Sequence, residues 1–295
     1  MRAKNRTKRY SLRADRVVKA TWKEARVLTG FMEDQYLRTY AAEHLAKISE
    51  QAQVRFLTAI EASRQERNRL PAIPLDATPI RPATNPQIES IRTDSIFLNS
   101  FKDRPYQFAW VDPGKIVAIQ ADVSLPIEKV PEDPDDLIDY FLPHAWEIPV
   151  EIAPSAPGTF VFLSSYPHIA SNPQPVIEVE HSRSKLIVRP PQHLNLTQVL
   201  ALNGRLFCRN GHNRIAAAIK AGLVEIPVVL VQGVFPPDIA LGAPPQFFDP
   251  GMLLTVARPP LVADLLGPAS TTIPVRERRY GFGIQISTFP LNHPI

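Results

Sequence analysis

The chain has 295 residues, of which 44% are hydrophobic and 21% are charged, so it is long enough for one large domain or two modest ones with a real core. No stretch approaches the roughly 18–20 uninterrupted apolar residues of a membrane helix, and no apolar segment follows the basic N-terminus as in a secretory signal. A single cysteine, Cys208, excludes an internal disulfide and is typical of a reducing cytoplasm, where we expect this protein.

Positive charge is concentrated in the first 30 residues. The net charge of the chain is +4, but this segment holds ten basic and two acidic residues, a net charge of +8, so the remainder carries −4. The basic residues expected to contact nucleic acid are Arg2, Lys4, Arg6, Lys8, Arg9, Arg13 and Arg16. A basic arm on an acidic body favours attraction to DNA. A solvated tail without a partner explains the same charges, so both interpretations stay open.

Residues 1–70 are predicted to form a basic, helical N-terminal arm. From about Thr21 to Leu70 there is no proline, and apolar residues recur at steps of three and four, as on one face of a helix. Proline-studded residues 71–87 then predict a linker. Further on, Asp112-Pro113 is a good start for a helix that we predict to reach about Ala121.

The C-terminal part of the chain, 236–295, is predicted to be an extension with little regular structure. It contains eleven of the 31 prolines, and proline removes a backbone donor that helices and sheets need.

The segment 199–231 predicts a hairpin, a glycine loop, a helix and a strand, in that order. Asn203-Gly204 stands between two apolar runs, and both residues tolerate the positive φ of a type I′ turn. A short alanine-rich helix follows the loop 210–214 and ends before Gly222. The apolar run 226–231 predicts a buried strand, in which Pro227 is tolerated near the start.

The loop that precedes the predicted helix has the composition of a phosphate site. A glycine at a helix start lets the backbone approach a ligand, and the free N–H groups of the first turn, with the helix dipole, favour an anion. The candidate donors around Gly211 are Asn210, His212, Asn213 and Arg214. Alternatively, Gly211 only makes a tight turn and Arg214 forms a surface ion pair, since one glycine is weaker evidence than a complete P-loop.

Two blocks of the sequence resemble the ParB/sulfiredoxin superfamily, and they occur in the same order. Residues 209–217, followed by Gly222 and by Ile-Pro-Val at 226–228, are similar to its signature, in which a Gly-x-x-Arg turn opens a helix and an Ile-Pro-Val strand follows. Upstream, residues 96–104 resemble the first conserved box of ParB-type domains, and residues 104–116 resemble an Arg-Pro … Asp-Pro-x-Lys-Val element of sulfiredoxins.

This resemblance implies an α+β fold over 88–235, with a small mixed β-sheet and helices, and with a long insertion at about 124–197. It also implies that the domain binds a nucleotide phosphate at Gly211 to Arg214, with Arg104 and Lys115 close by, and that the ligand is an NTP (CTP or ATP) with Mg²⁺. Sulfiredoxins have a cysteine directly after the signature glycine, where this chain has His212, so peroxiredoxin repair is not expected. ParB proper carries two arginines in the turn and a later helix-turn-helix domain, and this sequence departs from both.

Other candidate chemistry is weaker. The seven histidines have no metal-ligand spacing, so we expect no structural metal. Glu178 and Glu180 lie in a strand-like run where a carboxylate can act as a base, although an exposed strand edge explains the alternation more simply. Tyr280 and Phe282, beside a basic run, fit nucleic-acid stacking, but a terminal strand over 281–287 is the simpler interpretation.

Three functions fit these features. The first is a bacterial-type regulatory or accessory protein whose core binds a nucleotide and whose basic arm binds DNA or a partner. The second is a phosphate-using enzyme of the same superfamily, such as a small-molecule kinase, an NTPase or a nuclease. It requires a divalent ion and carboxylates near Arg214, for which the candidates are Asp112, Asp122, Glu178 and Glu180. The third is an interaction scaffold in which the site has decayed. The sequence does not specify an oligomeric state.

Overall fold

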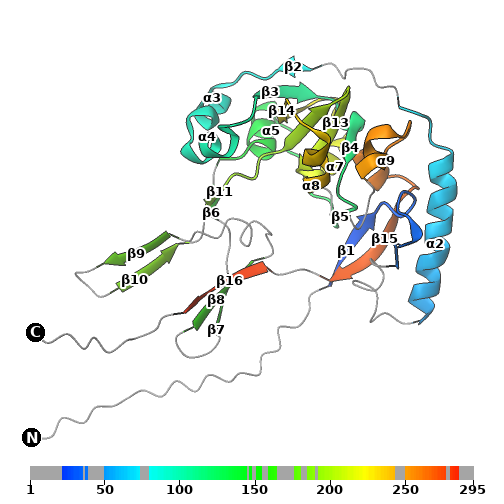
Figure 1. The fold of residues 1–295 in the computed structure, drawn as a ribbon, viewed down its shortest axis with the longest axis horizontal. Helices are drawn as coiled ribbons and strands as arrows, with labels where there is room; N and C mark the ends of the chain where they lie inside the picture. Colours follow the sequence, from blue (N-terminus) through cyan, green and yellow to red (C-terminus); the bar gives the residue numbers. More distant parts are fainter. Residues whose placement is uncertain are drawn as a thin grey trace, which may run out of the picture. The chain divides into compact units, whose positions relative to one another are not determined.

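The computed structural model describes residues 22–35, 37–38, 50–73, 80–144, 146–147, 151–154, 159–164, 176–180, 185–189, 192–242, 250–276 and 280–285. The chain divides into two compact units, of which the larger is formed by Trp22–Trp146 and Leu194–Arg276. The described residues form seven α-helices and several sheets, which confirms the predicted α+β class (Figure 1). None of the described helices is long and apolar enough to cross a membrane.

A six-stranded mixed sheet is the centre of the larger unit (Figure 1). In spatial order, its strands are β2 (Arg81–Pro82), β3 (Tyr106–Val111), β14 (Ile226–Val231), β12 (Gln198–Leu202), β13 (Arg205–Asn210) and β4 (Ile116–Ala118). β12 runs parallel to β14 and β13 runs parallel to β4, whereas the other neighbours are antiparallel. The predicted small mixed sheet is therefore present, and all six residues of β14 are buried.

Helices cover both faces of this sheet, because successive side chains of a strand point to opposite sides. The first face carries α5 (Pro134–Phe141) and α7 (His212–Lys220), and Cys208 of β13 points to His212 on this side. The second face carries α3 (Pro86–Thr93), α4 (Ser95–Phe101), α8 (Pro236–Gly242) and α9 (Pro250–Thr255). On that side, Phe97 of α4 packs against Phe108 and Tyr106, and Arg205 of β13 donates to a carbonyl of α9.

The local turn chemistry around β13 follows the prediction. Asn203 and Gly204 join β12 to β13 with φ of 52° and 76°, the positive values that a type I′ turn requires. Gly211, with φ of 98°, separates β13 from α7, and Gly222, with φ of 77°, follows the end of α7. The predicted hairpin, loop, helix and strand are all confirmed.

Two of the predicted helical segments contain strands instead. Trp22–Val27 is strand β1, and its side chains alternate between buried Ala25 and Val27 and more exposed neighbours. The predicted helix that starts at Asp112 is only the single turn η1 (Pro113–Lys115), although Asp112 does accept from the amide of Gly114 at 2.8 Å. Ile116–Ala118 then forms β4, because its buried apolar side chains pair with β13. Farther along the arm, helix α2 (Glu50–Asn68) agrees with the helical prediction.

The two ends of the larger unit's sequence meet in a second sheet. β1 lies between β15 (Thr271–Arg276) and β5 (Asp122–Ser124), antiparallel to both. The segment predicted as an extension thus contributes β15 and the turn η2 (Val262–Leu265) to the core of this unit. β2 likewise comes from the predicted linker. The arm, the linker and the extension as far as Arg276 are therefore parts of one folded unit over their described residues, whereas β16 (Tyr280–Gln285) of the extension belongs to the second unit.

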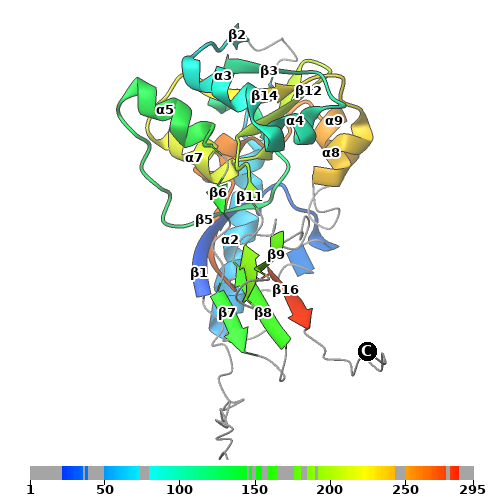
Figure 2. The same ribbon diagram turned by 90° about the vertical axis from the view of Figure 1, so that its left-hand side faces the viewer.

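The second unit is built of short antiparallel strands (Figure 2). β7 (Glu151–Pro154), β8 (Thr159–Ser164) and β16 (Tyr280–Gln285) form one sheet, and β9 (Val176–Glu180) pairs with β10 (Lys185–Arg189). Tyr280 and Phe282 thus lie in a strand, as the simpler interpretation predicted, and Glu178 and Glu180 lie in β9. β6 (Trp146–Glu147) and β11 (Gln192–His193) form a further short pair.

Candidate functional site

The start of α7 has the backbone geometry of an anion site. Gly211 is the N-cap residue and provides no side-chain hydrogen bond, while its carbonyl accepts from Ile215 N at 2.9 Å. The N–H groups of the first turn, on His212, Asn213 and Arg214, have no acceptor within the helix. Together with the positive end of the helix dipole, these three donors suit an anionic ligand.

A buried hydroxyl lies directly beneath this turn. A Cβ atom added to Gly211 would stand 2.9 Å from Thr197 Oγ1, so only glycine fits this close approach. Thr197 is fully buried, and among the described residues its Oγ1 is the one buried side-chain oxygen or nitrogen without a hydrogen-bond partner. The glycine is therefore required both by its positive φ and by the packing of Thr197.

Arg214 does not reach a surface where it would bind phosphate directly, contrary to the prediction. Its Nη1 donates to the carbonyls of Tyr140 and Phe141 at 3.1 and 3.2 Å, and its Nη2 donates to Asn195 Oδ1 at 3.2 Å. Burial lowers the pKa of Arg214 to about 10, so the guanidinium remains charged at neutral pH. The side chain satisfies the C-terminal carbonyls of α5 and is not the surface ion pair of the alternative interpretation either.

The His212 side chain is also buried, so the backbone N–H of this residue is its remaining donor for an anion. Its Nε2 accepts from the amide of Gln120 at 3.2 Å, so the neutral ring carries its proton on Nδ1. Nδ1 lies 3.2 Å from Cys208 Sγ, which lies 3.5 Å from the carbonyl of Asn210. With the proton on Nδ1, the imidazole donates to Cys208 Sγ, and the thiol donates to the carbonyl of Asn210. Burial lowers the pKa of His212 to about 3 and raises the pKa of the Cys208 thiol, so both groups are neutral core residues.

The two asparagines of the loop differ in their surroundings. Asn210 Nδ2 donates to Asn195 Oδ1 at 3.1 Å and to the carbonyl of Leu196 at 2.8 Å, which ties the end of β13 to the segment before β12. Asn213 is exposed, and its Oδ1 accepts from Ser124 N at 3.1 Å. Of the four predicted side-chain donors in this loop, Asn213 is exposed, Asn210 is partly exposed, and His212 and Arg214 are buried.

The structure does not bring Arg104 and Lys115 to this loop. Leu206 of β13 pairs with Ile116 of the parallel strand β4, so Lys115 stands opposite Arg205. Arg205 is five residues before Asn210 along β13. At 3.3 Å per residue, that separation is about 16 Å along the sheet. Arg104 Nη2 instead contacts Asp238 Oδ1 at 2.7 Å, next to α8 on the second face of the sheet.

The carboxylates that an enzyme would need are divided between the two units. Asp112 caps η1, and Glu178 and Glu180 belong to the second unit. Asp122 is on β5, a strand that contacts α7, and its Oδ1 lies 3.3 Å from Gln120 Nε2. Within the part of the chain that the structure describes, no three His, Cys, Asp or Glu side chains come together as they would to hold a metal ion.

The predicted nucleic-acid contacts of the arm lie outside the described residues: Arg2, Lys4, Arg6, Lys8, Arg9, Arg13 and Arg16. Arg26, the last arginine of the basic segment, lies within the described residues. Its Nε and Nη2 donate to the carbonyls of Leu265 and Gly267 at 2.9 and 2.6 Å. This arginine stabilises the contact of β1 with the turn before β15.

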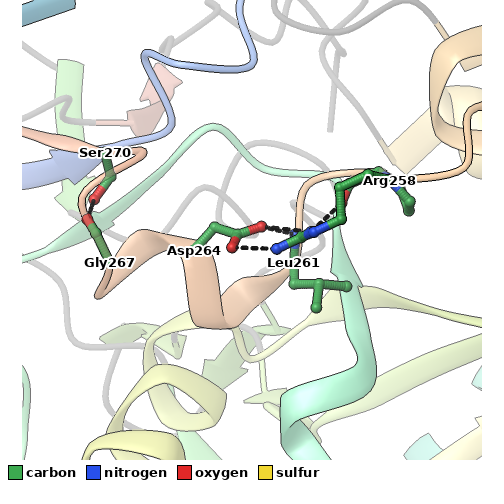
Figure 3. Close-up of polar contacts among 6 residues, drawn as sticks. Arg258, Leu261, Asp264, Gly267 and Ser270 are labelled. Carbon is green, nitrogen blue, oxygen red and sulfur yellow. Dashed lines mark hydrogen bonds and ion pairs between the residues drawn. The ribbon is translucent and has the colours of Figure 1, made fainter. Parts of the chain in front are cut away.

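An ion pair next to η2 was missed by the sequence analysis (Figure 3). Arg258 donates to both oxygens of Asp264, at 2.9 and 2.6 Å, and Asp264 Oδ2 also accepts from the amide of Leu261 at 2.7 Å. The guanidinium stands 5.8 Å from the ring centroid of Phe31. The spacing of an aspartate three residues after Leu261 is a capping signal. Both charges are satisfied by these contacts, so this cluster fixes the fold and is not a candidate site.

Comparison of the chain with protein-family models, curated proteins and solved structures gives no match. Fold and site define an α+β protein in which a helix with a glycine N-cap leaves one end of a mixed sheet.

Proposed function

We propose that the protein binds the phosphate of a nucleotide, CTP or ATP with Mg²⁺, at the N-terminus of α7, and that it acts as a cytoplasmic regulatory protein whose basic arm contacts DNA or a partner. The observation that carries the proposal is the start of α7 at Gly211, where φ is 98° and no side chain caps the helix. The resemblance of residues 209–217 to a phosphate-binding signature supports the same ligand class.

The charge balance near this helix start also supports an anion. The described acceptors of Arg214 are two carbonyls and an amide oxygen, all uncharged, and no described carboxylate forms an ion pair with it. A buried cation is costly, and nearby negative charge lowers that cost; the Glu128 carboxylate already acts on the pKa of Arg214, but without a direct ion pair. A phosphate on the first turn of α7 would add such a charge and would also meet the helix dipole.

The test is calorimetric titration with CTP, ATP and ADP in the presence of Mg²⁺, using Asn213→Asp as the decisive variant. Aspartate keeps an acceptor for the amide of Ser124, which Asn213 Oδ1 now accepts at 3.1 Å. Its negative charge suits a helix N-terminus, so the fold is kept, but the same charge repels phosphate. We expect saturable binding by the wild type and at least about tenfold weaker binding by the variant.

The matched control is Asn203→Asp, the same chemical change in the hairpin turn at the other end of β13. Asn203 is exposed and has a φ of 52°, which aspartate tolerates. Affinity should be unchanged in this control. The absence of binding by the wild type, or equal affinity in Asn213→Asp, would overturn the proposed site.

A further inference from the structure

A second surface of interest surrounds Asp238, at the start of α8 on the second face of the main sheet. One carboxylate oxygen of Asp238 accepts from Arg104 at 2.7 Å, and the other accepts from the amide of Phe235 at 2.9 Å. Both oxygens are therefore engaged. Asp238 holds the Arg104 side chain, which is 40% exposed, next to the turn that presents Phe235.

Arg209 adds a second cation to this surface. Gln198 pairs with Asn210 and Val199 pairs with Cys208, so Arg209 is the extra residue of a β-bulge, a feature that re-aims a side chain. In β13 it follows the alternation of Arg205, which points to the side of α8 and α9. α8 contacts β13, and the charges of Arg104 and Asp238 both act on the pKa of Arg209, which burial lowers. Arg209 therefore belongs to the strand that α8 contacts, on the same face of the sheet as the Arg104–Asp238 pair.

The charges of this cluster do not cancel. Arg104 is paired with Asp238, whereas Arg209 has no hydrogen bond or ion pair with any residue that the structure describes. Two cations face one carboxylate, which leaves a net charge of +1. Arg209 is exposed as a residue although burial lowers its pKa, and its guanidinium has donors for one further acidic group.

Phe235 supplies an apolar side chain next to the Arg104–Asp238 pair, because its amide donates to Asp238. Its side chain is 68% exposed, and it is the one aromatic residue among the exposed large hydrophobic residues in the described ranges. Pro236 and Pro237, which follow it, are exposed as well. An exposed aromatic side chain with a neighbouring arginine is the composition of a binding hot spot.

We propose that Arg104, Arg209 and Phe235 form a docking surface for a peptide segment of a partner protein, in which a carboxylate stands next to an apolar side chain. Arg209 would bind the carboxylate through its paired N–H groups, and Phe235 would pack against the apolar side chain. A single uncompensated cation suits one carboxylate. It does not suit a nucleic acid, whose interfaces typically neutralise about six to ten phosphates.

The test is selection of a displayed library of random dodecapeptides on the immobilised full chain, followed by calorimetry with the enriched peptides. We expect the wild type to enrich peptides with Asp or Glu beside an apolar residue. Affinity for these peptides should fall at least about tenfold in Arg209→Gln and in Phe235→Ala. Both side chains are exposed, so neither substitution removes a buried contact.

Two matched controls make the same chemical changes elsewhere on the surface. Lys220→Gln removes an exposed cation at the end of α7, and Val224→Ala shortens a side chain that is 80% exposed. Neither should change peptide affinity. Asn213→Asp should also bind the peptides normally, which separates this surface from the proposed nucleotide site.

Several results would overturn the proposal. These are the absence of enrichment, enrichment without an acidic residue, and peptide affinity that is unchanged in both Arg209→Gln and Phe235→Ala. Binding of oligothymidylate that is lost in Arg209→Gln would assign the surface to nucleic acid instead. Self-association in sedimentation velocity that is lost in Phe235→Ala would assign it to a second copy of the chain.

Discussion

The Arg214 side chain shows how a residue of a ligand-binding motif can be needed for the fold. Its guanidinium donates to the carbonyls of Tyr140 and Phe141 and to the amide oxygen of Asn195. Arg214→Ala removes all three of these hydrogen bonds, although Asn195 Oδ1 keeps Asn210 Nδ2 and the carbonyl of Phe141 keeps the amide of Thr197 as donors, so we expect the free energy of unfolding to fall by about 2–4 kcal/mol in urea denaturation. Lys220→Ala, at an exposed position of the same helix, should change it by less than about 0.5 kcal/mol. An Arg214→Ala protein of wild-type stability would contradict these contacts. Loss of nucleotide binding in Arg214→Ala alone is therefore weak evidence for a direct phosphate contact.

His212 should make the folded state sensitive to acid. Burial lowers its pKa from 6.5 to about 3, so between these values the unfolded chain binds a proton that the folded chain does not. The part of the folding free energy that comes from neutral His212 is fully present above pH 6.5. It is lost as the pH falls toward 3, at about 1.4 kcal/mol per pH unit. His212→Gln keeps an acceptor for the amide of Gln120 but does not titrate. Between pH 7 and 5, the wild type should lose about 2 kcal/mol more than this variant in urea denaturation. Equal losses would show that His212 has the same pKa in the folded and the unfolded chain, contrary to its burial.

The ends of α7 allow the effect of a positive φ to be separated from the effect of packing. Gly211 and Gly222 have φ of 98° and 77°, but an added Cβ meets Thr197 Oγ1 at 2.9 Å at the first and nothing within 4 Å at the second. Gly222→Ala should cost about 1–2 kcal/mol of unfolding free energy from backbone strain alone. Gly211→Ala should cost at least about 1 kcal/mol more, because of the added crowding. Thr197→Ala should recover this excess in a double-mutant cycle measured by urea denaturation. Equal costs at both glycines would refute the close approach.

Elements whose signals are local were predictable from the sequence, and elements defined by distant partners were not. The hairpin turn at Asn203-Gly204 and the helix after Gly211 depend on the φ preferences of a few adjacent residues. Strand β1 pairs with β15, about 250 residues later in the chain, so its six residues show no local preference strong enough to exclude a helix. The same limit applies to the site. The position of Gly211 predicted the start of α7. The burial of Arg214 could not be predicted in this way, because it depends on carbonyls of α5 that lie 73 and 74 residues away in sequence.

At the scale of the whole molecule, the position of β1 decides how the basic arm must be tested. Residues 1–21 hold eight basic residues and one acidic residue, a net charge of +7, and β1 begins directly afterwards at Trp22. Deletion of residues 1–30 removes the central strand of the β15-β1-β5 sheet, with the buried side chains of Ala25 and Val27, so we expect that protein to unfold. Loss of DNA binding in it would carry no information about the arm.

Deletion of residues 1–21 is the informative change, because it removes the charge and keeps β1. If the arm binds DNA, the affinity of the full chain for a duplex should fall steeply with salt, and the logarithmic slope is about 0.9 per neutralised phosphate. Fluorescence anisotropy at several salt concentrations should give a slope near zero, or no binding, for the shortened chain. Its thermal unfolding should match that of the full chain, because the sheet around β1 is intact. A slope that survives the deletion would place the DNA contacts on the folded units, and salt-independent binding would exclude the arm altogether.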